Sequence, residues 1–262
     1  MLLFFKRLRK GLIEKEDIRK YLLYGLGEVL LVMIGILLAL QVNNWRDGRK
    51  ERAKEHEYLK NLKVNLESTR FSLESEMSTS EKRIAFGSDL KQPLPAGEIE
   101  YDAKIDLIWK AIELSNFTPH QYYMPAYDDL KSSGNLPILR SEEIKAGLAG
   151  YSYRVNVFES MIYRNTERLK QQYEDVMSRY ISPSFHAAHW EMGINGKVAP
   201  SAKELRDLNV NIQGLLGDSK FHHYLEVIMG LEAELKVLYG VLLKENVQPT
   251  IDLVVQELKK FE

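Results

Sequence analysis

The stretch YLLYGLGEVLLVMIGILLALQVNNW runs from Tyr21 to Trp45 and decides how the whole chain is interpreted. Its first twenty residues, Tyr21 to Leu40, are mainly apolar and carry a single charge, Glu28. A helix needs roughly 20 apolar residues to cross a hydrocarbon layer ~30 Å thick. A cleaved signal peptide would have a shorter apolar core followed by a small-x-small cleavage site, and no good site follows here. We therefore predict an uncleaved signal anchor, with a transmembrane helix over residues 21–43.

The residues beside this span predict its interfaces and its orientation. Tyr21 and Tyr24 at one end and Trp45 at the other are placed where aromatic rings favour the two membrane surfaces. Residues 1–20 hold seven Lys and Arg against three acids, whereas residues 61–262 hold 23 against 29. Because a short basic tail stays in the cytoplasm, we expect the body to lie outside the membrane, in the periplasm of a diderm bacterium.

The basic tail, residues 1–20, has two possible states. Leu2, Phe5 and Leu8 alternate with basic residues, a pattern typical of a short amphipathic helix on an anionic inner leaflet. A disordered basic tail is the other interpretation, and the sequence leaves both open.

One face of the predicted span combines an acid with small side chains. Glu28, Val32, Gly35 and Ala39 follow each other at helical spacing. Gly35 and Ala39 allow a second helix to approach closely, and a carboxyl group facing lipid would be costly. We therefore expect this face to contact another helix, from a second copy of the chain or from a membrane-protein partner. Glu28 is then either a proton-responsive carboxyl group or an acid near the headgroups that snorkels to them or pairs with Arg19 or Lys20.

Residues 44–90 are predicted to continue as a membrane-proximal stalk helix. Between Arg46 and Phe86 there is no proline, and Gly48 is the only glycine. Apolar residues recur at a spacing of three and four, as in a helix with one buried face. This apolar seam can pair in a coiled coil with other copies or with later helices of the same chain, and both remain open. The seam consists of Leu59, Leu62, Leu66, Thr69 and Leu73.

The remaining chain, residues 91–262, is predicted to be an extracytoplasmic domain made of helices. The loop KQPLPAGE at 91–98 separates it from the stalk. Ser141 and Asp218 are typical N-cap residues, and Gly134 suits the left-handed end of a helix. No sustained strand pattern occurs, so we predict an all-α fold, a helical bundle around the stalk. The expected helices cover about 101–114, a segment from Pro119, 125–133, 142–180, a segment after Ser201 and Glu204, 218–245, and 249–261.

Two stretches resemble a known family. KYLLYGLGEVLLVMIGILLALQVNNW, residues 20–45, is similar to the first recurrent stretch of an uncharacterised family of single-span membrane proteins common in Bacteroidota. AYDDLKSSGNLPILRSEEIKAGLAGYSY, residues 126–153, resembles the second recurrent stretch of that family. The resemblance implies a bacterial inner membrane and an extracytoplasmic helical domain. The family is a domain of unknown function, so it implies no catalytic residues.

The sequence contains few candidate residues for catalysis or for binding metals or cofactors. The chain has no cysteine, which excludes disulfides and cysteine-ligated metals. His186 and His189 lie near Glu191, but they lack the His-Glu-x-x-His arrangement of a zinc enzyme. No phosphate-binding loop, nucleophile elbow or dinucleotide fingerprint occurs. We therefore expect no enzyme activity, no metal site and no cofactor.

The sequence does not favour nucleic-acid binding, and it offers one candidate region for small molecules. The body is acidic and its aromatic residues do not alternate with basic ones, so we expect no nucleic-acid partner. An aromatic-rich region is a candidate ligand pocket, although an aromatic layer that packs short helices on the bundle is the simpler interpretation. The candidate pocket residues are Trp109, Tyr122, Tyr123 and Tyr127.

Three functional hypotheses follow from these patterns. The first is a non-enzymatic membrane protein that self-associates or docks to a membrane partner and presents a helical domain as a scaffold or accessory subunit. The second is a ligand-sensing periplasmic module. The third is a subunit of an ion-driven membrane complex that uses Glu28.

Overall fold

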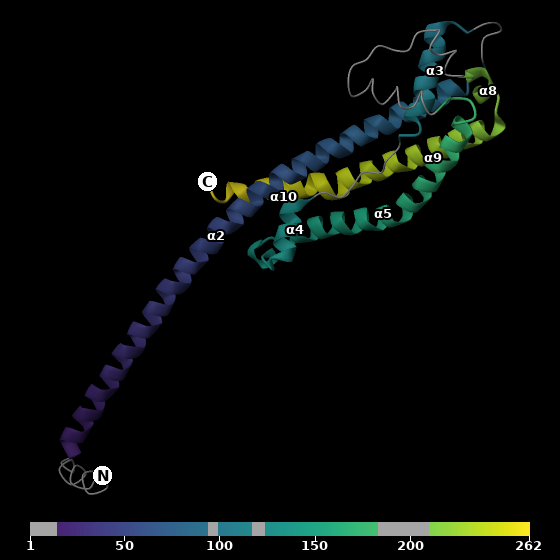
Figure 1. Cartoon of the computed structure of the whole chain (residues 1–262). Coiled ribbons are helices and arrows are strands. Elements are labelled where there is room, and N and C mark those ends of the chain that lie inside the picture. The colour runs from purple at the N-terminus through teal and green to yellow at the C-terminus, as the bar shows by residue number, and fades with distance from the viewer. Residues whose placement is uncertain (1–14, 94–98, 117–123, 183–209) are drawn as a thin grey trace. The chain divides into compact units, whose positions relative to one another are not determined.

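The computed structural model describes residues 15–93, 99–116, 124–182 and 210–262. Every regular element in these ranges is helical, which confirms the predicted all-α class (Figure 1). The chain divides into two compact units, Met1–Glu57 and Tyr58–Glu262. The division falls inside the segment 44–90 that we predicted as a stalk, because residues 58–90 pack with the later helices.

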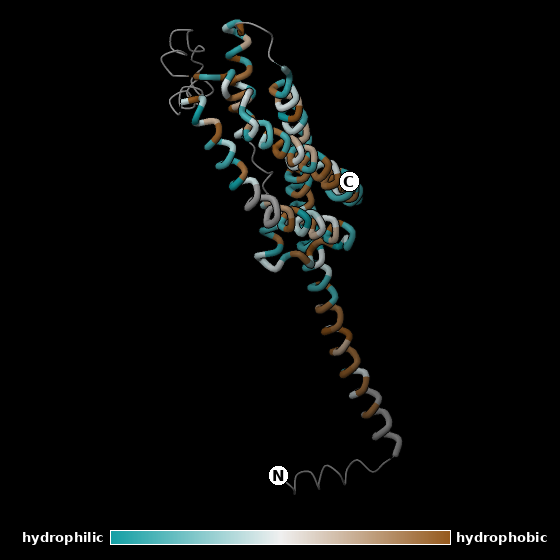
Figure 2. Tube along the Cα trace, turned by 90° about the vertical axis from the view of Figure 1, so that its right-hand side faces the viewer, coloured by the Kyte–Doolittle hydropathy of each residue, from teal (hydrophilic) through white to brown (hydrophobic). Residues whose placement is uncertain are grey.

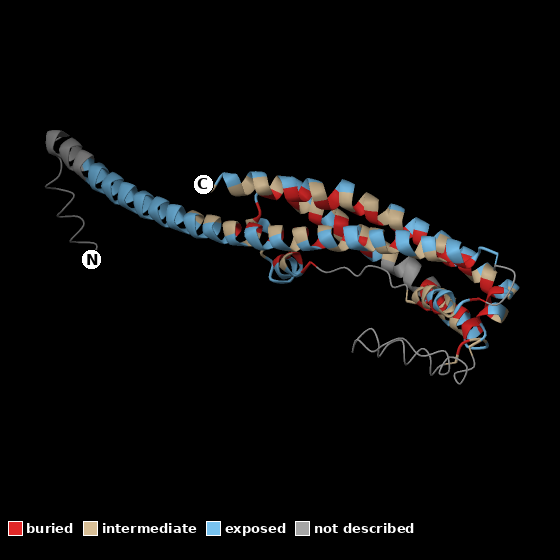
Figure 3. Ribbon diagram, turned by 90° about the horizontal axis from the view of Figure 1, so that it is seen from above, coloured by how far each residue is buried: buried red, intermediate tan, exposed pale blue. Residues whose placement is uncertain are grey.

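Helix α2, Lys15–Leu90, is 76 residues long and contributes to both units. It contains no proline, and its glycines do not interrupt it. Among the described helices, α2 alone has a stretch long and apolar enough to cross a membrane, by length and composition. Figure 2 shows this stretch as a brown run along α2, and Figure 3 shows it as exposed. An apolar helix surface without cover is typical of a helix surrounded by lipid or by another helix.

The second unit is built from the rest of α2 and from a series of later helices. They are α3 Tyr101–Glu113, α4 Pro125–Ser132, the 3₁₀ helix η1 Leu136–Ile138, α5 Glu142–Met177, α8 Ile212–Leu216, α9 Ser219–Leu242, the π-helical segment η2 Leu243–Val247, and α10 Gln248–Lys259. The expected helices that start at Pro119 and after Ser201 lie outside the described residues.

Local capping signals act as predicted where the structure describes them. The Ser141 side chain accepts a hydrogen bond from the backbone N–H of Ile144 at the start of α5. The Asp218 carboxylate accepts from the N–H groups of Lys220 and Phe221 at the start of α9. Gly134 has a φ of 70°, the left-handed conformation that ends a helix and that glycine adopts without steric cost.

The predicted break before Pro249 is absent. We expected one helix to end near Glu245 and another to begin at Pro249. Instead, α9 passes through η2 directly into α10, with Pro249 in the first turn of α10. Proline lacks an N–H and its ring clashes with the carbonyl four residues earlier in an α-helix. The wider π turn avoids that conflict without ending the helix.

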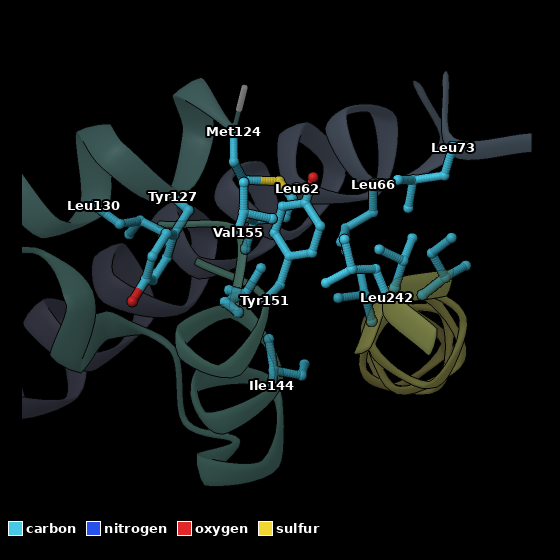
Figure 4. Close-up of a cluster of buried hydrophobic side chains, with 14 of the residues drawn as sticks. Leu62, Leu66, Leu73, Met124, Tyr127, Leu130, Ile144, Tyr151, Val155 and Leu242 are labelled. Atoms are coloured by element: carbon cyan, nitrogen blue, oxygen red, sulfur yellow. The ribbon is translucent and has the colours of Figure 1, made fainter. Parts of the chain in front are cut away.

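The apolar seam of α2 is buried within the chain itself. Leu59, Leu62, Leu66 and Leu73 are each at most 1% exposed, and Thr69 is 5% exposed. The four leucines belong to one hydrophobic cluster with side chains from α4, α5, α9 and α10 (Figure 4). Of the two alternatives for the seam, the structure therefore shows pairing with later helices of the same chain. We name this group the α4 cluster; it includes Leu62, Leu66, Tyr127, Tyr151, Leu242 and Val254.

A second hydrophobic group lies around α3 and α8. We name it the α3 cluster; it includes Leu90, Ile108, Leu114, Tyr173, Leu215, Phe221 and Ile228. Within this cluster the Tyr173 and Phe221 rings stack with centroids 5.6 Å apart. The Tyr173 hydroxyl, fully buried, donates to the carbonyl of Ala111 at 2.8 Å, which satisfies its polar group.

Helices α2 and α9 cross both clusters side by side in opposite directions (Figure 1). Lys91 near the end of α2 pairs with Glu226 at 2.9 Å, and Glu81 pairs with Lys236 at 2.7 Å. Between these pairs the helices approach closely, because a Cβ on Gly87 would lie only 2.6 Å from the Met229 side chain. The close packing of Met229 on Gly87 favours this register of the two helices, and the two exposed ion pairs add little to it.

Candidate functional site

The predicted membrane face lies on the exposed part of α2. Glu28, Val32, Gly35 and Ala39 are all exposed. Apart from the neighbouring backbone of α2 itself, no described atom lies within 4 Å of the place where a Cβ on Gly35 would be. The face is therefore open to a neighbouring helix or to lipid along its whole length.

The predicted interface anchors are described only in part. Trp45 is 64% exposed, and the guanidinium carbon of Arg49 lies 5.0 Å from the centre of its ring. This distance is within the range of a cation–π interaction. The side chains of Tyr21 and Tyr24 lie outside the described residues.

A buried polar layer in the second unit was missed by the sequence analysis. Glu232 on α9 is 1% exposed, and its carboxylate accepts from the Ser80 hydroxyl at 2.6 Å and from Arg83 Nη1 at 3.0 Å. Arg83 Nη2 also donates to the carbonyl of Asn116, at 2.8 Å. The ion pair is thus hydrogen-bonded on both sides, as a buried charge requires. We use "polar layer" for Ser80, Arg83, Glu232 and their neighbour Glu76.

The polar layer lies between the two hydrophobic clusters along α2 and α9. On α9, Glu232 lies between Ile228 of the α3 cluster and Leu235 of the α4 cluster. On α2, Ser80 lies between Leu73 of the α4 cluster and Leu90 of the α3 cluster. A signal existed in the sequence, because Ile228, Glu232 and Leu235 follow each other at the spacing of one helix face. An acid on an otherwise apolar face indicates a buried carboxylate with a cationic partner.

Glu76 gives the polar layer a second acid. Burial raises the pKa of its carboxyl group, the Arg83 guanidinium acts in the opposite direction, and the Glu232 carboxylate raises the pKa further. Two carboxyl groups therefore share the field of one guanidinium. Glu232 makes the direct contact with Arg83.

Helix α4 is docked on α2 through side chains that lie far apart in sequence. The Asn65 Oδ1 atom accepts from the backbone N–H of Ala126 at 2.9 Å. The Met124 N-cap supplies no side-chain hydrogen bond, so Asn65 satisfies one of the free N–H groups at the start of α4. The Tyr58 hydroxyl donates to Asp129 Oδ2 at 3.2 Å and accepts from the Asn135 side chain at the same distance. These contacts tie α4 and the turn after it to α2.

The described members of the candidate aromatic pocket lie in different places. Trp109 is partly buried against the α3 cluster. Tyr127 is 5% exposed and belongs to the α4 cluster, where burial raises the pKa of its hydroxyl. The structure does not bring these two rings into one cluster. Tyr122 and Tyr123, like His186, His189 and Glu191, lie outside the described residues.

Comparisons with known proteins give one finding. Residues 28–183 match the family described as "Family of unknown function (DUF6090)", which is more than half of the chain. Searches of curated proteins and of solved structures gave no match. The matched region contains the predicted membrane face, most of the polar layer and the docking of α4 on α2. The chain belongs to this family of unknown function.

Proposed function

We propose that this protein is a non-enzymatic, single-span protein of a bacterial inner membrane, with its N-terminus in the cytoplasm and residues 58–262 in the periplasm. It acts there as a scaffold or accessory subunit. The exposed apolar stretch of α2 carries this proposal, since such a surface is costly in water and suited to lipid. The excess of basic residues before the stretch supports the orientation.

The span associates through the face of Glu28, Val32, Gly35 and Ala39, with a second copy of the chain or with a helix of a membrane partner. In lipid, helices gain by close backbone approach, which glycine and alanine allow. The exposure of all four residues on α2 supports this step. The contacts within the second unit support a structural role for the body, because its buried acid and cation bind each other.

The association is tested by measuring the mass of the full-length protein in mild detergent by light scattering, corrected for bound detergent. We expect a defined oligomer that Gly35→Leu dissociates. Gly27→Leu is the matched control, because residue 27 lies about 80° away from residue 35 around the helix. An oligomer that both changes dissociate equally would contradict the assignment to this face.

If the protein is a monomer in detergent, self-association is excluded there, and binding to a membrane-protein partner is tested next. Crosslinking in the native membrane through a photoreactive residue at position 32 would then detect it. If position 32 gives no adduct in the membrane and the purified protein is monomeric, the association is refuted.

The orientation is tested by fusing reporters after Glu262. Alkaline phosphatase, which folds in the periplasm, should be active, and a green fluorescent protein that folds only in the cytoplasm should be dark. The opposite pattern would refute the proposed compartment.

A second candidate function rests on Glu28. Its carboxyl group is exposed on an apolar helix, where acids in membrane proteins mark proton or ion pathways. If the chain is a subunit of an ion-driven complex, Glu28→Gln should leave the oligomer intact but abolish the growth phenotype that the wild-type gene restores in a deletion strain. Glu28→Asp, which keeps the acid, should restore growth. Full restoration by Glu28→Gln would exclude this candidate.

A further inference from the structure

A cationic face follows the apolar stretch of α2. Arg46, Arg49 and Lys50 lie within an arc of about 100° when each residue of the helix turns the chain by about 100°. Arg46 and Lys50 are 64% and 67% exposed at their side chains. Glu51 lies outside this arc, so positive charge gathers on one face just beyond the last apolar residues.

The carboxylates near this cationic face neutralise its positive charge only in part. Asp47 lies 3.8 Å from both Arg46 and Lys50, so one carboxylate is shared by two cations near the limit of an ion pair. Exposed pairs of this kind contribute little and leave the cations available. Arg52, in contrast, is committed to Glu55, whose carboxylate is 2.6 Å away and almost fully buried.

The Arg49 guanidinium has N–H groups available to bind an oxyanion. Its guanidinium carbon lies 5.0 Å from the centre of the Trp45 ring, and no carboxylate of the described residues pairs with it. Stacking on a ring uses the face of the guanidinium and leaves its N–H groups free at the edge. Phosphate groups are bound by this edge with paired hydrogen bonds.

We propose that Arg46, Arg49 and Lys50, together with Trp45, bind the phosphate groups of anionic phospholipids at the membrane surface. The proposal rests on the proposed membrane span, and it adds the ligand and the residues that bind it. A lipid headgroup is the matching occupant because the cations follow the apolar stretch directly and because an exposed tryptophan at that point suits the interface. Headgroup binding fixes the depth and rotation of α2 in the bilayer.

The test measures quenching of Trp45 fluorescence by brominated lipids. Full-length protein is placed in mixed micelles that contain brominated phosphatidylglycerol or brominated phosphatidylcholine at equal mole fraction. Trp45→Phe, measured in parallel, gives the signal of the other two tryptophans to be subtracted. We expect the anionic lipid to reach half-maximal quenching at a mole fraction several-fold lower than the zwitterionic lipid. High salt should remove the difference, because it screens exposed charges.

Two charge-matched variants decide whether these residues are responsible. Arg46→Gln/Arg49→Gln/Lys50→Gln should make the two lipids quench equally. The control removes three exposed cations of the second unit and should keep the preference: Lys60→Gln/Lys82→Gln/Lys131→Gln. Equal quenching by the two lipids in the wild type would overturn the proposal. So would a preference that survives the first variant, or one that the control loses equally.

Failure of this proposal is separable from failure of the membrane span. Membranes of expressing cells are washed with alkaline carbonate, which releases peripheral proteins. Release of the wild-type protein would refute the span and the lipid site together. Retention with equal quenching by the two lipids would refute the lipid site alone.

Discussion

Arg83 of α2 and Glu232 of α9 form an ion pair of 3.0 Å in the interior of the second unit, with side chains 12% and 1% exposed. The pair lies between two hydrophobic clusters, where a slip of α2 along α9 would place each charge against apolar side chains. Because an unpaired buried charge is far more costly than a buried pair, this contact favours one register of the two helices.

Removing one member of this pair should therefore destabilise the fold more than removing both. We expect Arg83→Met to lower the free energy of unfolding by about 3–5 kcal/mol, since it leaves the Glu232 carboxylate buried without its cation. Arg83→Met/Glu232→Leu should recover at least half of that loss. Urea unfolding of the full-length protein in mild detergent, followed by circular dichroism, measures both. A double variant no more stable than Arg83→Met would contradict this account.

Glu76 should make stability depend on pH. Its folded-state pKa is raised by burial, so the folded chain holds a proton more tightly than the unfolded chain. The stability from that proton is complete below the ordinary pKa of 4.5 and is lost as the pH rises through the folded-state value. Glu76→Gln should thus be more stable than the wild type near pH 7, and the difference should close toward about pH 4.

The matched control for Glu76 is Glu74→Gln on the exposed side of the same helix. Thermal melting across this pH range should show no comparable gain for the control. A stability difference between Glu76→Gln and the wild type that stays constant with pH would show that protonation is not its cause.

Asn65 should stabilise the start of α4. Asn65→Ala removes the acceptor for the N–H of Ala126 and should cost about 0.5–2 kcal/mol, as for the loss of an N-cap. Hydrogen exchange should accelerate within residues 125–132 more than elsewhere. Asn61→Ala, one turn earlier and exposed, should leave exchange in α4 unchanged. If both variants accelerate exchange in α4 equally, the cause is a general change in α2 and not the loss of the hydrogen bond to Ala126.

Gly147 should tolerate no side chain. A Cβ at this position would overlap the hydroxyl of Thr250, which is held by its hydrogen bond to the carbonyl of Asn246. Gly147→Ala should destabilise by about 1–3 kcal/mol, the usual range for overpacking. Gly230→Ala has open space around it and should be neutral or stabilising, because alanine favours a helix. A stabilising Gly147→Ala would show that α5 and α10 are not closely packed there.

Much of the fold was predictable because its signals are local. Ser141 and Asp218 cap the helices that follow them, and Gly134 ends α4 by its backbone conformation, as their types and positions indicate. The apolar stretch of α2 also needs no partner to be recognised. Hydrogen bonds between neighbours and the length of an apolar run are properties of the chain itself.

The sequence is least informative about contacts between residues that lie far apart in the chain. Trp109 and Tyr127 lie close in sequence, and they pack on different clusters. The π turn η2 joins two helices that Pro249 was expected to separate. The apolar spacing around Glu232 indicates a buried acid with a cationic partner, but a single sequence does not show that the partner is Arg83.

The sequence by itself determined the all-α class, the long apolar stretch of α2 and most helix ends, since these depend on composition and on contacts within a few residues. Only the tertiary structure decided that the apolar seam of α2 packs against later helices of its own chain, and that Arg83 meets Glu232 between two hydrophobic clusters. The reason is physical: burial and ion pairing depend on which surfaces meet, and residues 149 positions apart meet only after the helices have packed.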